Sequence, residues 1–326
     1  MSSRRIDGAE RVRAQRGTTL VAVGNYDGVH RGHQAVIAAA ADRAIADGLR
    51  PLVLTFHPHP HEVLGGRRHQ LLTRTDRKVQ LLLRIHPNLA VVVEPFTREL
   101  AGLPPEVFVN EVLVARLGAR EVLVGENFRF GRKREGDLAL LRRLGADRGF
   151  QACSEPLHGD ASGAFSSTRV RAAIAAGDLP QAELVLGRPH ALTGEVVAGD
   201  GRGREIGFPT ANLEGVAEAL PPDGVYACLV DQLATPRGAT RLALGVANLG
   251  VRPTVGAGRS IEVHLLGHRQ DLYGRTLRLH LVARLREERR FSSLDELVRQ
   301  IGADVEAAST VLADRRPDPA AFGAWH

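Results

Sequence analysis

Residues 21–49 read VAVGNYDGVHRGHQAVIAAAADRAIADGL and place a glycine-containing loop between two very different segments. The apolar residues before Gly24 are few and rich in valine, which is typical of a strand buried on both faces. The residues after His33 have apolar side chains at helical spacing. A strand, a loop and a helix in this order predict a βαβ unit and therefore a parallel sheet.

The same alternation continues as far as residue 186. Further strand-like segments lie at residues 51–56, 89–96 and 120–128, and helix-like segments lie between them at residues 76–85 and 104–118. We therefore predict an α/β domain with a parallel, Rossmann-like sheet over residues 1–186. Ligands of such sheets bind at the carboxyl ends of the strands.

The pattern changes after Gly187. Strand-like segments now follow one another without long helices, at residues 191–199, 224–233, 240–250, 260–267 and 276–286. The next strongly helical segment covers residues 293–316. Several short strands at regular spacing predict an antiparallel β-barrel, which we place in a second domain over residues 187–326.

Composition narrows the class of protein. Hydrophobic residues make up 44% of the chain and charged residues 25%, as in ordinary globular proteins. No apolar run approaches the roughly 20 residues of a membrane-spanning helix, and the amino terminus lacks a signal-peptide core. Cys153 and Cys228 are far apart, so neither a disulfide framework nor a zinc ribbon is indicated. We expect a cytoplasmic protein with no membrane partner.

The net charge of +6 comes almost entirely from arginine, since Lys78 and Lys133 are the only lysines. The arginines are scattered among acidic residues along the chain and form no basic patch, so we expect no nucleic-acid partner. The chain has no GxxxxGK[ST] loop, and we expect no lysine chemistry. Phosphate is then expected on arginine, histidine, backbone amides or a metal.

The HRGH sequence at residues 30–33 falls where the first long helix begins. Backbone amides at a helix start are unpaired and carry partial positive charge, which suits a phosphate. Histidines three residues apart on a helical turn face the same way, so His30 and His33 could both contact one polyphosphate. That arrangement suits nucleotidyl transfer, in which positioned donors stabilise a departing pyrophosphate.

Two other interpretations of this motif stay open. The histidines could be helix caps or ordinary surface residues. They could also bind a metal, with help from the HPHPH sequence at residues 57–61. The two prolines make HPHPH extended rather than helical, so its histidines would not share one helical face.

The sequence FSSTRVR at residues 165–171 has a similar ambiguity. It places Ser167 and Thr168 at a predicted helix start, with Arg171 in the first turns. Alone, these residues would be a helix cap and a solvated face. Opposite the two histidines, they would form a clamp on a triphosphate.

In the second domain, the glycine-rich sequence GDGRGREIGFPTAN covers residues 199–212. Such a loop can place backbone amides on phosphate, while Thr210 and Asn212 offer neutral oxygens to a hard cation. Glu262 lies on a strand, on the face opposite Ile261 and Val263, and could accept a proton from an attacking hydroxyl. The alternatives are a simple turn and a solvent-facing carboxylate.

Several motifs occur in an order and spacing that resemble one known family. In the first domain they are GNYDGVHRGHQ, TFHPHP, GENFRFGRKREGD and SSTRVR, and in the second GFPTAN, DGVYA, GVRPT, IEVH, DLYG and LREERRFSSLDEL. The chain resembles bacterial bifunctional riboflavin kinase/FAD synthetases from about residue 21 to residue 314. The resemblance assigns the first domain to the HxGH nucleotidylyltransferase superfamily and the barrel to riboflavin kinases.

The resemblance implies roles for residues in the first domain. His30 and His33 would be catalytic and contact the phosphates of ATP. The other implied ATP-binding residues are Gly24, Asn25, Gly32, Ser167, Thr168 and Arg171. Asn127 and Arg129 would position FMN or the nucleotide. His57 stands where the family more often has aspartate.

The resemblance also implies roles in the barrel. Glu262 would be the catalytic base for the ribityl 5′-hydroxyl group, and Thr210 and Asn212 would hold the ATP-bound Mg²⁺. The implied ATP-binding residues are Gly201, Gly203, Arg204, Gly207, Thr210 and Asn212. Gly267 and His268 depart from the usual start of the following loop.

Taken together, the resemblance implies two reactions. Riboflavin would be phosphorylated by ATP to FMN, and FMN would then be adenylylated by a second ATP to FAD, with release of pyrophosphate. One alternative is a chain in which only the riboflavin kinase is active. Another is a non-catalytic flavin-binding regulator, which would predict loss of the HxGH motif or of Glu262, and both are present.

Overall fold

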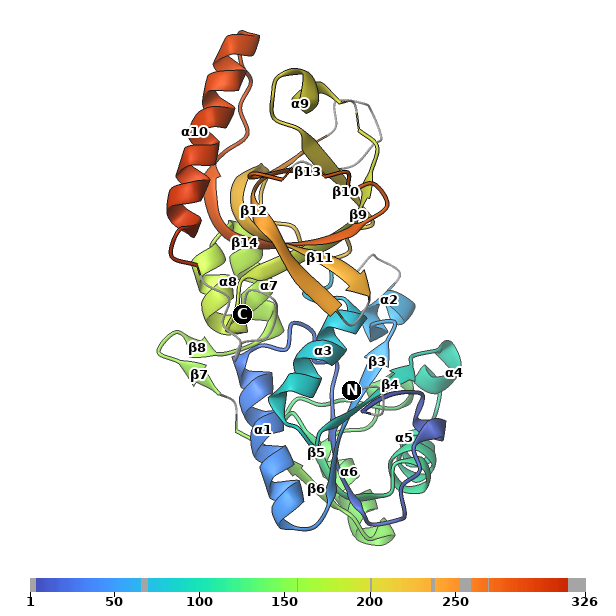
Figure 1. Ribbon diagram of the computed structural model, residues 1–326. Helices are drawn as coiled ribbons and strands as arrows, with labels where there is room; N and C mark the ends of the chain where they lie inside the picture. Colours follow the sequence, from blue (N-terminus) through green and yellow to red (C-terminus); the bar gives the residue numbers. More distant parts are fainter. Residues whose placement is uncertain are drawn as a thin grey trace. The chain divides into compact units, whose positions relative to one another are not determined.

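The computed structural model describes residues 4–65, 70–156, 158–199, 201–235, 238–251, 259–268 and 270–315. The GVRPT motif therefore lies largely outside the described residues. The chain forms two compact units, shown in Figure 1. Unit 1 contains Met1–His69 and Lys78–Phe165, and unit 2 contains Gln70–Arg77 and Ser166–His326.

Unit 1 is built on a six-stranded sheet with the strand order β1-β4-β3-β2-β5-β6. All of its strand pairs are parallel, which confirms the predicted sheet. The strands are β1 (Arg5–Asp7), β2 (Thr19–Val23), β3 (Arg50–His57), β4 (Ala90–Pro95), β5 (Ala119–Val124) and β6 (Gln151–Ser154). The outermost strands β1 and β6 were not predicted, because three or four residues give too short a pattern to recognise.

Helices and short turns connect these strands. They are η1 (Ala9–Arg11), α1 (Arg31–Ala46), α2 (Pro60–Leu64), α3 (Thr75–Ile85), α4 (Arg98–Ala101), α5 (Pro105–Phe108), η2 (Val109–Arg116), η3 (Arg132–Arg134) and α6 (Leu138–Arg148). A small hairpin, β7 (Gly159–Asp160) and β8 (Gly163–Ala164), ends the unit. The helix predicted at residues 104–118 is thus α5 followed by the π-helix η2.

The core of unit 1 lies between the sheet and its helices. Every residue of β2 is buried, as expected for a parallel strand covered on both faces. Val21, Leu52 and Val122 from the sheet share one cluster with Leu113 of η2 and Leu141 of α6. The valine-rich runs of the sequence are therefore the centre of the sheet.

Unit 2 is built on a closed barrel with the strand order β10-β13-β12-β11-β14-β9. All neighbouring strands are antiparallel, which confirms the predicted barrel. The strands are β9 (His190–Val197), β10 (Thr210–Glu214), β11 (Gly224–Thr235), β12 (Gly238–Val251), β13 (Arg259–Leu265) and β14 (Thr276–Arg286). The helices are α7 (Ser167–Ala176), α8 (Leu179–Leu186), α9 (Arg202–Glu205) and α10 (Leu294–Leu312).

Alternate side chains separate the two faces of the barrel wall. Tyr226, Ala247 and Val263 belong to one buried cluster. A second cluster joins Val225 and Val246 to Ala308 of α10, so this helix covers part of the other face. In Figure 1, α10 runs beside the barrel.

Two elements of unit 2 differ from what the sequence predicts. The PTAN sequence, for which a simple turn was one alternative, leads into strand β10 (Thr210–Glu214), which pairs with both β13 and β9. The four-residue helix α9 was not predicted. Both differences arise because pairing within the barrel, and not local preference, decides the conformation of short polar segments.

The predicted domain boundary between residues 186 and 187 remains a prediction. Contacts group α7, α8 and the segment Gln70–Arg77 with the barrel. Within the described part of the chain, no helix is both long enough and apolar enough to cross a membrane.

Replacement of Asp304 by alanine should lower the stability of unit 2. Its carboxylate accepts hydrogen bonds from Arg286 Nε (3.0 Å) and Nη2 (2.8 Å) and from Gln300 Nε2 (2.8 Å). Because Asp304 is only 4% exposed while Arg286 is partly exposed, we expect a loss of about 1–2 kcal/mol. Thermal unfolding followed by circular dichroism measures the change. The exposed Glu306→Ala on the same helix is the control, and an equal effect of both variants would contradict the assignment.

Candidate functional site

The HRGH sequence lies at the carboxyl edge of the unit 1 sheet. His30 is the N-cap of α1, and its Nδ1 accepts a hydrogen bond from the backbone N–H of His33 (3.3 Å). The two imidazole rings are stacked, with centroids 3.5 Å apart and planes 22° apart. The histidines therefore touch, as their spacing predicted. The capping interpretation is also correct for His30, while the predicted contact of both histidines with a polyphosphate stays a prediction.

The loop between β2 and α1 has an unusual backbone. Tyr26 has a φ of 51° and Val29 a φ of 41°, a region that non-glycine residues rarely adopt. Both side chains are buried, and side chains of the neighbouring elements α1 and β3 form hydrogen bonds with the backbone of the loop. Gln34 Nε2 donates to Val29 O (2.7 Å), and Thr55 Oγ1 donates to Asn25 O (3.0 Å). Such over-determined, strained loops are typical of functional sites.

Gly24 fits the same loop closely. A Cβ at Gly24 would lie 2.9 Å from the Tyr26 ring, and a Cβ at Gly32 would lie 3.2 Å from the His30 ring. Both glycines of the predicted site therefore allow the backbone to approach aromatic side chains. The conformation of the loop depends on them.

His33 is a neutral imidazole at neutral pH. Burial, the neighbouring His30 and the charge of Lys78 hold the pKa of His33 well below its usual value of 6.5. Its ring meets the Tyr26 ring edge-on at 5.1 Å, and its Nδ1 has no hydrogen-bond partner among the described residues. This nitrogen is buried, so its hydrogen-bonding capacity is unused among the described residues.

Lys78 belongs to this edge of the sheet, although the sequence analysis gave it no role. It lies in the first turn of α3, is 4% exposed, and donates from Nζ to Asn25 O (3.1 Å) and Phe56 O (3.2 Å). The signal in the sequence was its position inside an amphipathic helix in a chain with only two lysines.

The HPHPH sequence has a structural role at His59. This side chain caps α2, and Glu62 completes a capping box with it. The His59 and His61 rings stack with centroids 5.5 Å apart, and His57 is exposed at the end of β3. Among the residues that the structure describes, no group of three or more His, Cys, Asp or Glu side chains could hold a metal ion.

Asn127 and Arg129 are exposed in the loop after β5. Arg129 forms an ion pair with Asp137 (3.2 Å). Phe130, between them and η3, is buried and packs against Phe108 and Phe128. Core packing thus anchors the loop and leaves its polar side chains outside.

Ser167, Thr168 and Arg171 lie in the first turns of α7. The cap of this helix is Ser166, whose Oγ accepts a hydrogen bond from Arg169 N–H (3.1 Å). Arg171 Nε donates to Gln70 O (3.2 Å). Since α7 belongs to unit 2 and the HRGH sequence to unit 1, the predicted clamp on triphosphate stays a prediction.

A polar row crosses the outer face of the barrel. Glu262 on β13 pairs in register with Asn212 on β10 and with Asn248 on β12. Thr210 pairs with His264 in the same way. The intervening side chains of β13 and β10 face the barrel core, which agrees with the predicted alternation for Glu262.

The glycine-rich loop packs against this polar row. A Cβ at Gly199 would collide with the Asn212 amide, and one at Gly203 would collide with Phe208 O and lie 3.3 Å from Thr210 Oγ1. His264 Nδ1 is 2.8 Å from Pro209 O, which fixes the end of the loop. The glycine-rich loop and the polar row therefore lie in contact with each other.

The remaining predicted residues of this loop are at its turn positions. Gly201 begins α9 with a φ of 75°, and Gly207 follows it with a φ of 86°. Arg204 is exposed on α9. Gly267, where the chain departs from the resembled family, has a φ of 70° two residues after the end of β13, a conformation that favours glycine.

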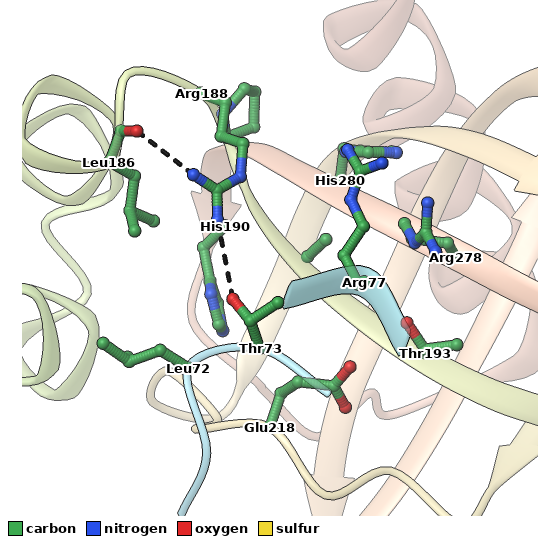
Figure 2. Close-up of a pocket in the computed structure, with 12 residues that line it drawn as sticks. Leu72, Thr73, Arg77, Leu186, Arg188, His190, Thr193, Glu218, Arg278 and His280 are labelled. Atoms are coloured by element: carbon green, nitrogen blue, oxygen red, sulfur yellow. Dashed lines mark hydrogen bonds between the residues drawn. The ribbon is translucent and has the colours of Figure 1, made fainter. Parts of the chain in front are cut away.

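A separate buried pocket lies in unit 2 (Figure 2). It is lined by Leu72, Thr73, Arg77, Leu186, Arg188, Pro189, His190, Ala191, Thr193, Glu218, Arg278 and His280, and none of these is a predicted site residue. Arg188 donates to Leu186 O (3.1 Å) and Thr73 Oγ1 (3.5 Å). A cavity volume of about 20 Å³ has room for a water molecule and not for a nucleotide.

The buried histidines of this pocket should make stability depend on pH. Burial is the main reason that the pKa of His190 is lowered to about 4, and the pKa of His280, beside Asp231, is lowered likewise. Since the unfolded value is about 6.5, stability is complete above that pH and falls as the pH drops towards 4. Each histidine contributes up to about 3 kcal/mol of this loss at pH 4.

His190→Gln should reduce this pH dependence, because glutamine retains an N–H donor for Ala219 O but does not titrate. Urea unfolding at a series of pH values measures the slope. His158→Gln, at an exposed position, is the control. An unchanged slope in His190→Gln would contradict the prediction.

Comparison with known proteins defines the class of each unit. Residues 12–169 match the family described as FAD synthetase, and residues 186–312 match the family described as riboflavin kinase. The parallel-sheet unit with its HRGH loop thus corresponds to the first family and the barrel to the second.

The chain belongs to the bifunctional riboflavin kinase/FMN adenylyltransferase family. It is 41% identical to the member from Escherichia coli K12 over an alignment of 300 residues. That alignment covers 91% of this chain and 94% of the Escherichia coli protein. It is 32% identical to the Bacillus subtilis member, and that alignment covers 94% of this chain and 96% of the Bacillus subtilis protein. A solved structure named as a macrolide-efflux protein from Streptococcus pneumoniae is 28% identical, with a TM-score of 0.78 over 94% of this chain and 98% of that chain.

Proposed function

We propose that this chain converts riboflavin to FMN and FMN to FAD, using one ATP in each reaction. The observation that carries the proposal is the match to bifunctional relatives along nearly the whole chain, with the HRGH loop and Glu262 both in place. The barrel would carry out the phosphorylation and the parallel-sheet unit the adenylyl transfer.

In the adenylyl transfer, a phosphate oxygen of FMN attacks the α-phosphorus of ATP. The bond from that phosphorus to the bridging oxygen breaks, and pyrophosphate leaves. His30, His33 and the amides at the start of α1 donate hydrogen bonds to the charge that builds on the leaving group. Because His33 is neutral in the free protein, it acts first as a hydrogen-bond donor and not as a fixed charge.

Other residues of this reaction would bind substrates. Gly24, Asn25 and Gly32 would admit the triphosphate to the loop. Ser167, Thr168 and Arg171 would close over the triphosphate. Asn127 and Arg129, exposed on their loop, would position FMN or the nucleotide.

In the phosphorylation, Glu262 would accept the proton of the ribityl 5′-hydroxyl group as its oxygen attacks the γ-phosphorus of ATP. ADP leaves as the bond to the bridging oxygen breaks. Gly201, Gly203, Arg204 and Gly207 would bind the phosphates through the glycine-rich loop, which packs on the polar row.

Mg²⁺ fits the donor set of this row. Thr210 and Asn212 present neutral oxygens on one face of β10, with the Glu262 carboxylate opposite Asn212. Mg²⁺ commonly takes only one or two protein ligands and completes its shell with phosphate oxygens and water. When bound there, it would neutralise charge on the transferred phosphoryl group.

Two variants should separate the reactions. His33→Ala should lower FAD formation from FMN by about 10²–10³-fold, the usual cost of removing one transition-state donor, and leave FMN formation intact. Glu262→Gln should block FMN formation and leave FAD formation from supplied FMN intact. Separation of the flavins over time, with riboflavin or FMN as the starting substrate, measures both rates.

The controls are His158→Ala and Glu195→Gln, which change exposed residues of the same types. Both should resemble the unchanged protein. If the unchanged protein forms FMN but no FAD even from supplied FMN, the proposal of adenylyl transfer is wrong, and the chain is a kinase alone.

Asn212→Ala should raise the Mg²⁺ concentration needed for half-maximal FMN formation about tenfold, the effect of losing roughly one ligand bond. FAD formation from FMN should not change. Magnesium titration of both reactions tests this, with Glu195→Gln as the control on a neighbouring strand. Equal shifts in both reactions would contradict the assignment of Asn212.

A further inference from the structure

The buried lysine at the carboxyl edge of the unit 1 sheet has a role that the mechanism above does not use. Lys78 is one of two lysines in the chain and is 4% exposed. Burial of an ammonium group costs free energy unless polar groups surround it. An apolar side chain would fill the same space at lower cost, so the charge itself needs an explanation.

The contacts of Lys78 join two neighbouring strands beyond the point where their pairing ends. The last register pair of β2 with β3 is Val23 with Leu54. Two residues further along each strand, Lys78 Nζ donates to Asn25 O (3.1 Å) and to Phe56 O (3.2 Å). The ammonium group therefore replaces the backbone pairing that the sheet no longer supplies.

Asn25 opens the strained loop that ends at His30. Its carbonyl accepts hydrogen bonds from both Lys78 and Thr55, so its position is fixed from two elements. The next residue, Tyr26, already has a φ of 51°. Without the ammonium group, less would oppose relaxation of this loop to an ordinary conformation.

The charge of Lys78 also reaches the proposed phosphate site. After burial and the neighbouring His30, it is the third cause that lowers the pKa of His33. The groups that face Lys78 are Asp27 on the loop and Glu62 on α2, both of which favour its charged form, and His33 on α1. Burial outweighs the two carboxylates and lowers the pKa of Lys78 to about 8.

We propose that Lys78 is a positioning residue of the adenylyl-transfer site, whose ammonium group holds the Asn25 carbonyl against the end of β3 and so fixes the loop that carries His30 and His33. The proposal rests on the adenylyl transfer proposed above. Lys78 acts through the loop and through its field, and it does not itself react.

Lys78→Met tests the proposal, because methionine retains much of the stem but removes the charge and both hydrogen bonds. FAD formation from FMN should fall about 100-fold, the scale expected when reacting groups are misplaced by about 1 Å, with the larger share in kcat. FMN formation from riboflavin should not change. The pKa of His33, followed by NMR, should rise because one positive charge near it has gone.

Arg4→Met is the matched control. Arg4 also donates to backbone carbonyls in unit 1, including Leu83 O (3.1 Å) and Pro87 O (2.8 Å), but Leu83 lies in the last turn of α3 and Pro87 between α3 and β4, at the opposite edge of the sheet. Its loss removes a charge and several hydrogen bonds without touching the loop. Both reactions of Arg4→Met should match the unchanged protein.

The outcomes are distinct. If the unchanged protein makes no FAD, the proposed function fails. If it makes FAD and Lys78→Met makes it equally fast, the positioning role of Lys78 is wrong. If Lys78→Met lowers the rate but leaves the pKa of His33 in the folded protein unchanged, the effect is only loss of folded protein, and the proposal is again overturned.

A measurement on the unchanged protein decides the matter if Lys78→Met does not fold. Lysine labelled with ¹³C at Cε gives one signal each for Lys78 and Lys133, and Lys133→Arg assigns them. Saturating ATP should raise the pKa of Lys78 by about one unit, because a triphosphate near His33 favours the ammonium form. No change on ATP binding, in protein that makes FAD, would overturn the proposal.

Discussion

Parallel pairing of β2 with β3 is the constraint on which unit 1 depends. Hydrogen bonds between the two strands fix their carboxyl ends side by side, and each strand must then leave the sheet in its own direction. Beyond that point, polar side chains form the hydrogen bonds that backbone groups form within the sheet. Thr55 and Lys78 bind the carbonyl of Asn25, and the loop that follows is held in a backbone conformation it would not adopt alone.

In the barrel of unit 2, the position of the polar side chains follows from the packing of its interior. Its interior is filled by apolar side chains, so a small closed barrel of this kind leaves no room inside for a ligand. The row formed by Asn212 and Glu262 lies on the outer face of the barrel, apart from the wall around Val225 and Val246 that α10 covers. The proposed kinase site therefore consists of the barrel wall and of the glycine-rich loop that packs on it.

The sequence was informative wherever a pattern had a physical period. Valine-rich runs indicated the buried strands of the parallel sheet, and two-residue alternation placed Glu262 opposite Ile261 and Val263. The spacing of His30 and His33 predicted that their rings would share one face of α1. Residue patterns alone thus predicted both folds and the faces on which these side chains lie.

Long-range contacts account for what the sequence did not reveal. Nothing local in Thr210–Glu214 distinguishes a strand from a turn, because its two neighbouring strands lie elsewhere in the chain. Lys78 is separated from Asn25 by more than 50 residues, so no motif joins them. The role of His59 as a cap was likewise hidden, since histidine is not among the usual capping residues.

The interleaving of the two units has a consequence for dissecting the chain. Residues 70–77 interrupt the sequence of unit 1, yet Leu71 N–H donates to Ala217 O and Ala219 N–H donates to Leu71 O in unit 2. Arg74 adds a hydrogen bond to Thr193 O. A barrel fragment beginning at residue 187 would therefore lose a segment of backbone with which it pairs. No single cut separates the two units cleanly, and a faithful recombinant version of the barrel must have this short peptide restored to it.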